Sequence, residues 1–438
     1  MRTDGGAASP DYRAAITALA ARTTQGVRFG LDRTRELLAA CENPHERLRV
    51  LHVAGTNGKG STCATLDSVL QQQGFAVGRY SSPNLIDFSE RVLINGVAVD
   101  ESNIMCWLER HSGDIDRLGA TFFEATTAMA FDLLVEAHVD IAVIEVGLGG
   151  RLDSTNVVTP LVAAVTAIGL DHREFLGDTL TEIAIEKAGI FKPEVPAVIG
   201  ELDPAVIDTL HRVAVEVGAW PVIVAADVLP VRAAEVTEKG TMIELGDALC
   251  AGTLQLRSSL MGLHQAQNVA TAVAVLRAAG DPWTPSAATL SAGVAATRLA
   301  GRFQRIGPWL FDVAHNPDGM ATVVSSIRAI PLPRPLGAVI CVLSDKDWRL
   351  MLDELLPVVD QLWLTDAPTA PASRRWPLEE VVAYARARAG DRCQVFASPV
   401  FSEALDQSQR AAATVLVTGS FHTVGDALQR LQIDPLAG

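Results

Sequence analysis

Short apolar runs alternate with longer segments of helical periodicity along most of the chain. The clearest run, residues 139–146, is almost continuously apolar, which is typical of a strand in a parallel sheet that is covered on both faces. Residues 50–54 and 161–168 have the same character, and each precedes helix-compatible sequence. Repeated strand–helix order predicts an α/β protein with open, mostly parallel sheets.

The pattern divides the chain into two alternating units, with a boundary near residue 300. In the first unit we expect strands at 50–54, 76–80, 139–146, 161–168, 195–199 and 221–224, after a tail at 1–10. We also expect a hairpin at 91–99 around Asn95-Gly96, and a β-rich insertion at 228–260. Its expected helices are 12–23, 31–40, one ending near 73, 102–118, 122–137, 179–189, 205–217, 265–279 and 285–296. After a linker at 301–304, the second unit has expected strands at 309–313, 337–343, 361–364, 394–397 and 413–418, and helices at 319–329, 348–355, 378–387, 400–410 and 422–431.

The stretch between the first strand and its helix has the composition of a phosphate-binding loop. It consists of Gly55, Thr56, Asn57, Gly58, Lys59, Gly60, Ser61 and Thr62. Glycines let backbone N–H groups wrap an anion, and the helix start adds unpaired donors. Lys59 would supply a mobile charge, and a hydroxyl at Ser61 or Thr62 could reach Mg²⁺. The spacing departs from G-x-x-x-x-G-K-[ST], so a turn that merely packs tightly is the alternative.

Polar residues follow other strands of the first unit, at the edge of a parallel sheet where function gathers. Ser82, Glu145, Asp171 and His172 stand in such places, and their hydroxyl, carboxylate and imidazole groups suit a divalent cation beside nucleotide phosphates. A capping or surface role for Glu145 and a structural role for His172 are the alternatives.

Three further positions have weaker signals. Lys187 lies on a helix of small and apolar residues, where a lysine is usually solvated. Arg151, in a glycine-rich loop, could bind an anionic substrate or could be a bare turn residue. The segment 312–317 (DVAHNP) follows a strand of the second unit and could face the first across a cleft, with a plain helix cap as the alternative.

Bulk composition excludes some classes of function. The net charge of −15 argues against a nucleic-acid partner, which would require a basic surface. The cysteines at 41, 63, 106, 250, 341 and 393 form no CxxC pair and indicate a reducing compartment. No apolar run approaches the ~18–20 residues of a membrane helix, and no secretory signal pattern opens the chain. We therefore expect a cytoplasmic protein.

Ten motifs occur in an order that resembles one family of enzymes. They are VAGTNGKGST, YSSPNL, FFEATTAMAF, EVGLGGRLDSTNV, AIGLDHREFLGDTLTEIAIEKAGIFK, GLHQAQN, GRFQ, DVAHNP, SDKD and TGSFHTV. Together they resemble the folylpolyglutamate synthases, especially the bifunctional bacterial dihydrofolate synthase/folylpolyglutamate synthases, which belong with the Mur ligases of cell-wall synthesis. The resemblance covers nearly the whole chain, about residues 28–432.

The resemblance implies a division of the chain into two domains and a role for each motif. Residues 1–298 would form an ATP-binding, P-loop-containing domain with a mostly parallel sheet, and residues 299–438 a smaller, Rossmann-like α/β domain that completes the glutamate ligase. The nucleotide would contact residues 55–62 together with Asn268, Arg302, Asp312 and His315. The metal ligands would be Ser82, Glu145, His172 and Ser61, and the catalytic residues Lys59, Glu145, His172 and Lys187. The pterin-bearing substrate would contact Phe123, Glu124, Arg151 and Asp153.

The implied activity is ATP-dependent amide formation through an acyl phosphate. L-Glutamate would be added to dihydropteroate, giving dihydrofolate, and to the γ-carboxylate of reduced folates. The implied cofactors are ATP and two Mg²⁺ ions, with Lys187 carbamylated and a monovalent cation as further candidates. We expect a monomer with neither nucleic acid nor membrane as partner.

Two features of the sequence bear on the alternatives. Many relatives read SPHL where this chain has SPNL, so we assign no acid–base role to Asn84. The spacing of Lys59 and Ser61 favours the folate branch over a cell-wall Mur-type ligase, whereas a monofunctional folylpolyglutamate synthase differs by few residues. A nucleotide-driven switch or transporter ATPase would not need the segment 312–317, and a non-catalytic binding module would need none of Lys59, Ser82, Glu145 and His172.

Overall fold

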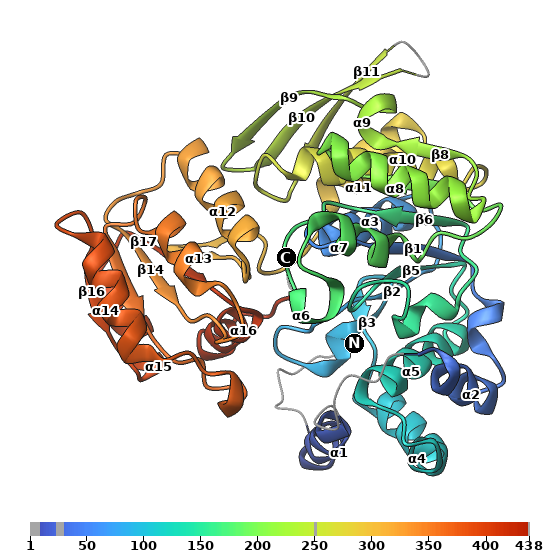
Figure 1. Cartoon of the computed structure of the whole chain (residues 1–438), viewed down its shortest axis with the longest axis horizontal. Helices are drawn as coiled ribbons and strands as arrows, with labels where there is room; N and C mark the ends of the chain where they lie inside the picture. The colour runs from blue at the N-terminus through green and yellow to red at the C-terminus, as the bar shows by residue number, and fades with distance from the viewer. Residues whose placement is uncertain (1–8, 23–29, 249–251, 437–438) are drawn as a thin grey trace.

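Each of the two predicted units contains its own sheet (Figure 1). The computed structural model describes residues 9–22, 30–248 and 252–436. Residues 1–8 of the predicted tail lie outside the described residues, as does Cys250. The first helix begins at Pro10, which the prediction had assigned to the tail.

The first sheet has eight strands in the order β4-β3-β2-β5-β1-β6-β7-β8. All neighbours from β2 to β8 are parallel, and β3 and β4 add the predicted hairpin in antiparallel fashion. The bounds are β1 Val50–Ala54, β2 Val77–Tyr80, β3 Val92–Ile94, β4 Val97–Ala98, β5 Ile141–Glu145, β6 Val162–Val165, β7 Ala197–Ile199 and β8 Val222–Val224.

Helices cover both faces of this sheet, which explains why its central strands are apolar throughout. In β1, Leu51 and Val53 pack on one core, while Val50 and Ala54 face two cores on the other side. The helices are α1 Pro10–Ala21, α2 Asp32–Ala40, α3 Lys59–Gln72, α4 Glu101–Leu118, α5 Phe122–Glu136, α6 Arg173–Leu176, α7 Leu180–Ala188, α8 Pro204–Val217, α9 Ala225–Val228, α10 Gln265–Ala278 and α11 Ala287–Ala296, with short 3-10 turns at Pro44–Arg47, Phe88–Arg91 and Ser154–Val157.

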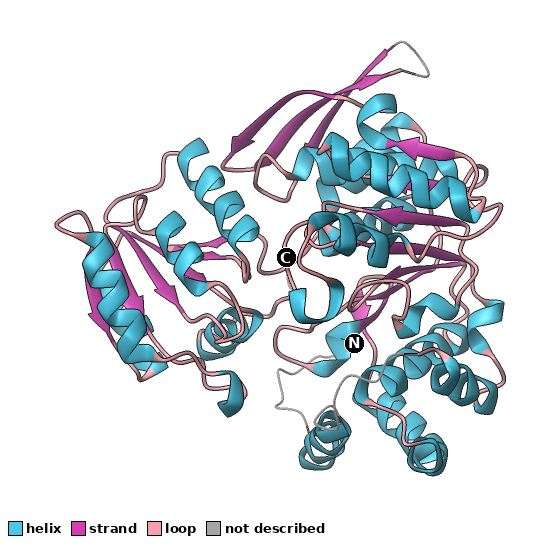
Figure 2. Ribbon diagram, in the orientation of Figure 1, coloured by secondary structure: helices cyan, strands magenta, loops and turns pink. Residues whose placement is uncertain are grey.

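The predicted β-rich insertion is an antiparallel sheet of three strands, β9 Val231–Thr237, β10 Gly240–Asp247 and β11 Gly252–Ser258. Ile243, Leu245 and Leu256 of this sheet join the core beneath α3 and α10. The insertion therefore packs on the first domain and leaves its sheet uninterrupted (Figure 2).

The second sheet has six strands in the order β12-β13-β17-β14-β15-β16, and only the β12–β13 pair is antiparallel. Its strands are β12 Gln304–Ile306, β13 Trp309–Phe311, β14 Leu336–Ile340, β15 Gln361–Leu364, β16 Gln394–Ala397 and β17 Thr414–Thr418. Its helices are α12 Pro317–Ala329, α13 Trp348–Leu355, α14 Leu378–Ala389, α15 Phe401–Ala411 and α16 Phe421–Arg430, with a 3-10 turn at Ala372–Arg374. Alternate residues of β14 and β17 face two cores, so this sheet too is covered on both sides.

Among the described strands and α-helices, the sequence pattern missed the three short elements β12, α6 and α9, and it predicted none of the 3-10 turns. It also placed a linker at 301–304, but Gln304 is the first residue of β12 and Phe303 is fully buried. A three-residue polar edge strand has too few side chains to show a period of two. The predicted boundary at 298/299 falls between the end of α11 and the start of β12. No helix in the described part of the chain is both long and apolar enough to cross a membrane.

Candidate active site

A cavity of about 800 Å³ lies where the carboxyl ends of the first sheet meet the second sheet. The loop 55–61, Ser82, Glu145 and Lys187 line it from the first domain, and Arg302, Asp312, His315 and Lys346 from the second. Open parallel sheets bind ligands at this edge. Most of the residues predicted as site residues are thus brought together.

The glycines of the loop are required by its geometry. Gly55 and Gly58 have φ angles of +149° and +89°. A Cβ at Gly55 would lie 1.9 Å from Oγ1 of Thr166, and one at Gly58 would lie 2.4 Å from Oδ1 of Asn268. Both positions therefore exclude larger residues. This close packing agrees both with a phosphate-binding loop and with the alternative of a turn that merely packs tightly.

The loop is also held by backbone contacts to the segment after β6. Thr56 donates from its backbone N to the carbonyl of Ala167 and from Oγ1 to the carbonyl of Gly169, at 2.8 and 3.1 Å. Ser61 lines the cavity, whereas Thr62 is fully buried outside it, and its Oγ1 has no hydrogen-bond partner among the described residues. Of the two hydroxyls, Ser61 is the one placed to reach a ligand.

Two lysines converge on one carbonyl of the loop. Lys59 donates to the carbonyls of Gly55 and Thr56, at 2.9 and 3.1 Å, and Lys187 donates to the carbonyl of Gly55 at 3.0 Å. Lys187 is 5% exposed. Burial, with the nearby charge of Lys59, lowers the pKa of Lys187 to about 7. Lys187 is therefore a buried residue beside the loop 55–62, and not the solvated lysine that is usual on such a helix.

Glu145 and Ser82 lie at the ends of the neighbouring strands β5 and β2, and His172 lies in the loop after β6. Glu145 is 5% exposed, and burial raises its pKa although the Ser82 backbone donates to its carboxylate. His172 has a φ of +51°, in the left-handed region, and caps the short helix α6. Burial lowers the pKa of His172 to about 4, so its imidazole is neutral and can act as a metal ligand.

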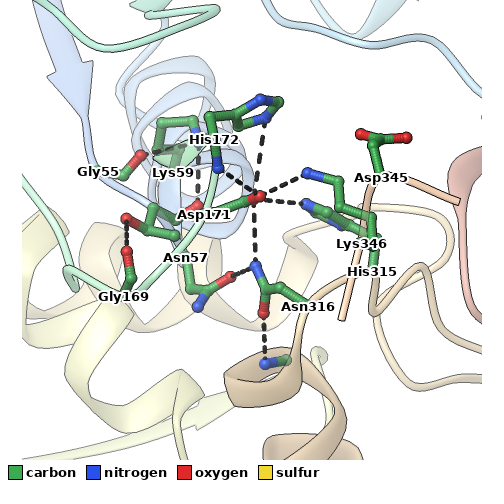
Figure 3. Close-up of polar contacts among 12 residues, drawn as sticks. Gly55, Asn57, Lys59, Gly169, Asp171, His172, His315, Asn316, Asp345 and Lys346 are labelled. Carbon is green, nitrogen blue, oxygen red and sulfur yellow. Dashed lines mark hydrogen bonds and ion pairs between the residues drawn. The ribbon is translucent and has the colours of Figure 1, made fainter. Parts of the chain in front are cut away.

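Asp171 links the two domains (Figure 3). Its carboxylate accepts from Lys346 Nζ at 2.5 Å and lies 3.3 Å from His315 Nε2 and 3.4 Å from Asn316 Nδ2. Burial alone would raise the pKa of Asp171, but His315, His172 and Lys346 hold it well below its usual value. The carboxylate is therefore ionised, and it fixes the polar edge of the second domain against the first.

The predicted nucleotide contacts outside the loop are Asn268, Arg302, Asp312 and His315, and all four line the cavity. Asp312 accepts from the backbone N of Phe303 and of Ala314, both at 2.8 Å, and burial raises its pKa to about 6. The Arg302 guanidinium lies 5.2 Å from the ring centre of Phe421. These contacts hold the Asp312 carboxylate and the Arg302 guanidinium in the part of the cavity wall that belongs to the second domain.

The predicted substrate residues divide into two groups. Phe123, Glu124 and Asp153 line the cavity, whereas Arg151 is absent from its lining and pairs with Glu186 at 2.9 Å. A Cβ at Gly147 would lie 2.3 Å from the Phe123 ring, so the glycine makes room for that ring. The role of Arg151 in substrate binding stays a prediction.

Glu124 and Asp153 also support the local structure. Glu124 closes the capping box of α5 with Thr121 and pairs with Arg33. Asp153 accepts from the backbone N of Gly147 and Leu148, at 3.0 and 2.8 Å. Both carboxylates therefore shape the walls of the cavity in addition to lining it.

Sequence reasoning missed several residues of the cavity. Lys346 and Ser420 fall inside the quoted motifs SDKD and TGSFHTV, but neither was predicted as a site residue, although both line the cavity. Arg91 was placed only in a hairpin, yet it lines the cavity and lies 5.1 Å from the ring centre of Phe122. No spacing in the sequence indicates this contact.

Comparison with known proteins identifies the family of this chain. Residues 53–276 match the Mur ligase middle domain, and residues 301–421 match the Mur ligase glutamate ligase domain. The dihydrofolate synthase/folylpolyglutamate synthase of Escherichia coli strain K12 is 38% identical over 386 residues, which cover 87% of this chain and 86% of that protein.

Solved structures of other proteins are similar to this chain along nearly its full length. The folylpolyglutamate synthase of Mycobacterium tuberculosis, complexed with ADP and AMPPCP, has a TM-score of 0.88 and 29% identity, covering 97% of this chain and 100% of that one. A bifunctional folylpolyglutamate synthase/dihydrofolate synthase with Mn, AMPPNP and L-glutamate bound has a TM-score of 0.81 and 32% identity, covering 96% of this chain and 98% of that one.

The fold, the glycine loop and the cavity between two sheets are those of an ATP-dependent ligase. The chain belongs to the Mur ligase family and, within it, to the dihydrofolate synthase/folylpolyglutamate synthases.

Proposed function

We propose that the cavity joins L-glutamate first to dihydropteroate and, in a separate reaction, to the γ-carboxylate of reduced folates, using one ATP for each amide bond. The observation that carries the proposal is the arrangement of charges in the cavity. A glycine loop with two lysines faces Lys346 and His315, which extend from the other domain.

The chemistry requires that a carboxylate be activated. A carboxylate is a poor electrophile, and transfer of the γ-phosphoryl group gives it a good leaving group, after which the amine of glutamate displaces phosphate. Such a reaction depends on positioning and on neutralising charge more than on covalent chemistry by the protein. The chain offers mainly cations and backbone donors for this purpose.

On the nucleotide side, the loop N–H groups and Lys59 bind the phosphates. Lys59 contacts only two carbonyls among the described residues, at 2.9 and 3.1 Å, so it can exchange them for phosphate oxygens. Asn268, Arg302 and Asp312 hold the remainder of the nucleotide. Since Asp312 and Arg302 belong to the second domain, bound nucleotide contacts both domains.

The residues around Glu145 fit a magnesium ion. Glu145 is a buried carboxylate beside Ser82, and hard oxygen ligands of this kind suit Mg²⁺. Ser82, Glu145 and His172, with Ser61 on the phosphate side, would hold the ion. When bound, Mg²⁺ neutralises charge between the phosphoryl donor and the substrate carboxylate.

Lys187 is suited to carbamylation. Only a neutral amine reacts with CO₂, and a pKa of about 7 leaves a substantial neutral fraction at physiological pH. The carbamate would change a buried cation into an oxygen ligand next to the loop. We include this modification in the proposal.

On the amine side, Lys346, which shares the Asp171 carboxylate with His315, provides positive charge for the carboxylates of glutamate. The Lys346 side chain is 9% exposed and has Asp171 as its ion-pair partner. The partly buried ring of Phe123 would pack against the pterin at the other end of the cavity, where Arg91 adds a cation.

The activity is tested by phosphate release with ATP, Mg²⁺ and L-glutamate, with dihydropteroate in one reaction and tetrahydrofolate in another. We expect release in both. Release with tetrahydrofolate alone would mean a monofunctional folylpolyglutamate synthase, and release only with a UDP-muramyl acceptor would mean a cell-wall ligase. ATP hydrolysis that needs no acceptor would contradict ligase function. A monomeric state, a cytoplasmic location, a second Mg²⁺ and a monovalent cation stay predictions.

A further inference from the structure

A second cluster of potential metal ligands lies outside the cavity, between helices α2, α4 and α5. It consists of Cys41, which caps the C-terminus of α2, His111 of α4 and Asp132 of α5. All three are buried, with exposures of 5, 6 and 6%. One ligand atom from each can be chosen so that all lie within 4.8 Å of one another. None of the three lines the active-site cavity.

The spacing is close to that of a transition-metal site. Cys41 Sγ lies 3.7 Å from His111 Nδ1, and His111 Nε2 lies 3.8 Å from Asp132 Oδ2. Bonds of about 2.0–2.3 Å to zinc place two ligands of one ion roughly 3–4 Å apart. The two distances run to different nitrogens of the His111 ring, so the side chains must shift before one nitrogen, the sulfur and a carboxylate oxygen can bind one ion.

Hydrogen bonding accounts for only part of the cluster, because Cys41 Sγ and His111 Nδ1 are hydrogen-bonded whereas the other ring nitrogen is not. Nε2 of His111 is buried and has no hydrogen-bond partner in the described part of the chain. The nearest carboxylate oxygen, Oδ2 of Asp132, is too distant at 3.8 Å and accepts instead from Trp107 Nε1 at 3.0 Å. A buried imidazole nitrogen left unpaired is costly, and a metal ion would satisfy it.

The surrounding charge is favourable for a cation. Asp132, Asp114 and Glu136 act on the cluster with negative charge, against the single guanidinium of Arg110. The Arg110 side chain is 52% exposed and is held by Glu136 at 2.8 Å. It can therefore swing away from Asp132 when an ion enters.

We propose that Cys41, His111 and Asp132 bind a structural Zn²⁺ ion, with water as the fourth ligand. The sulfur and imidazole ligands select zinc over the hard Mg²⁺ of the active site. Binding releases the thiol proton of Cys41. The ion ties α2 and α4 to α5, the helix whose first turn carries Glu124 into the cavity.

The test uses the full chain, stripped of metal by a chelator and titrated with Co²⁺ in an excess of Mg²⁺. A thiolate ligand gives cobalt a charge-transfer band that oxygen ligands in the active site cannot produce. We expect this band to saturate at one equivalent and to disappear when Zn²⁺ is added. Zn²⁺ alone should raise the midpoint of thermal unfolding.

Matched variants locate the ligand. Cys41→Ser should abolish both the band and the stabilisation by Zn²⁺, while Cys106→Ser, an exposed cysteine on α4, should keep both. A folded wild-type chain that gives no band overturns the proposal even if Cys41→Ser fails to fold. A band that survives Cys41→Ser, or that Cys106→Ser removes, overturns it as well.

Discussion

The two walls of the cavity are built in different ways. In the first domain, Lys59 and Lys187 reach only as far as the loop carbonyl beside them. In the second domain, the Lys346 side chain extends across the gap and meets Asp171 of the first domain, at a separation of 175 residues in the sequence. The first wall is therefore set by one sheet, and the second by the relative position of two sheets.

This difference predicts that changes in the two walls have different effects on the protein. A change in the first wall should impair chemistry without moving the domains, because its geometry is fixed by strands β1, β5 and β6. A change in the second wall should also alter how the domains meet, because Asp171 is contacted from the second domain by Lys346, His315 and Asn316.

The largest effect is expected from Lys59→Ala. Loss of this charge from the transition state should lower turnover on the order of 10³-fold. The thermal midpoint should change little, since Lys59 bonds only to carbonyls of its own loop. Phosphate release and thermal unfolding measure the two quantities, with Lys239→Ala, in the exposed turn between β9 and β10, as control. An unfolded Lys59→Ala chain would mean that the residue supports the fold and not the chemistry.

The next effect, on the contact between the two walls, is expected from Asp171→Asn. It leaves the buried Lys346 ammonium without a counter-charge, and breaking a buried pair costs about 3–5 kcal/mol. We expect a lower thermal midpoint, a higher KM for glutamate, and a larger radius of gyration by X-ray scattering.

Two comparisons make this prediction specific. Adding Lys346→Met to Asp171→Asn should restore part of the stability, because no unpaired charge remains, but should not restore the KM. Asp353→Asn, which removes an exposed pair with Arg388, should cost at most about 1 kcal/mol. Equal costs for the two aspartates would contradict a special role for Asp171.

An intermediate effect concerns pH. Lys187 has a pKa of about 7 when folded, against 10.5 for the free side chain. Between these values the unfolded chain binds more protons, so the free energy of unfolding should rise with pH, by at most about 1.4 kcal/mol per unit. In CO₂-free buffer, the slope should be shallower in Lys187→Met than in the wild type above pH 7, and equal below it. Identical slopes above pH 7 would contradict a neutral, buried amine.

Carbamylation predicts a further difference under the same conditions. At pH 7 to 8, added bicarbonate should raise the activity of the wild-type chain but leave that of Lys187→Arg unchanged, because a guanidinium forms no carbamate. Equal responses would remove the carbamate from the proposed mechanism.

The contrast between the walls also explains what the sequence could predict. The alternation of strands and helices follows from local patterns, and the prediction of mostly parallel sheets is confirmed. The loop 55–62 and Glu145 at the end of β5 were also found from local patterns, and their roles at the site stay predictions. The Asp171–Lys346 pair and the contact of Arg91 with Phe122 depend on how distant segments pack, so no spacing encodes them. The edge strand β12 is too short for a period, and the cluster of Cys41, His111 and Asp132 combines three helices with no common motif.

The smallest effect compares two residues predicted to bind substrate. Phe123 lines the cavity, and Phe123→Ala should raise the KM for dihydropteroate about tenfold, as expected for an aromatic contact worth about 1 kcal/mol or slightly more. Arg151 is exposed and must leave Glu186 to reach a ligand, so Arg151→Ala should raise the KM about threefold or less. Steady-state kinetics on both variants, with Glu186→Gln as the partner control, measures the difference. A larger rise for Arg151→Ala than for Phe123→Ala, with Glu186→Gln unchanged, would mean that the glycine-rich loop moves to bring the guanidinium onto the substrate.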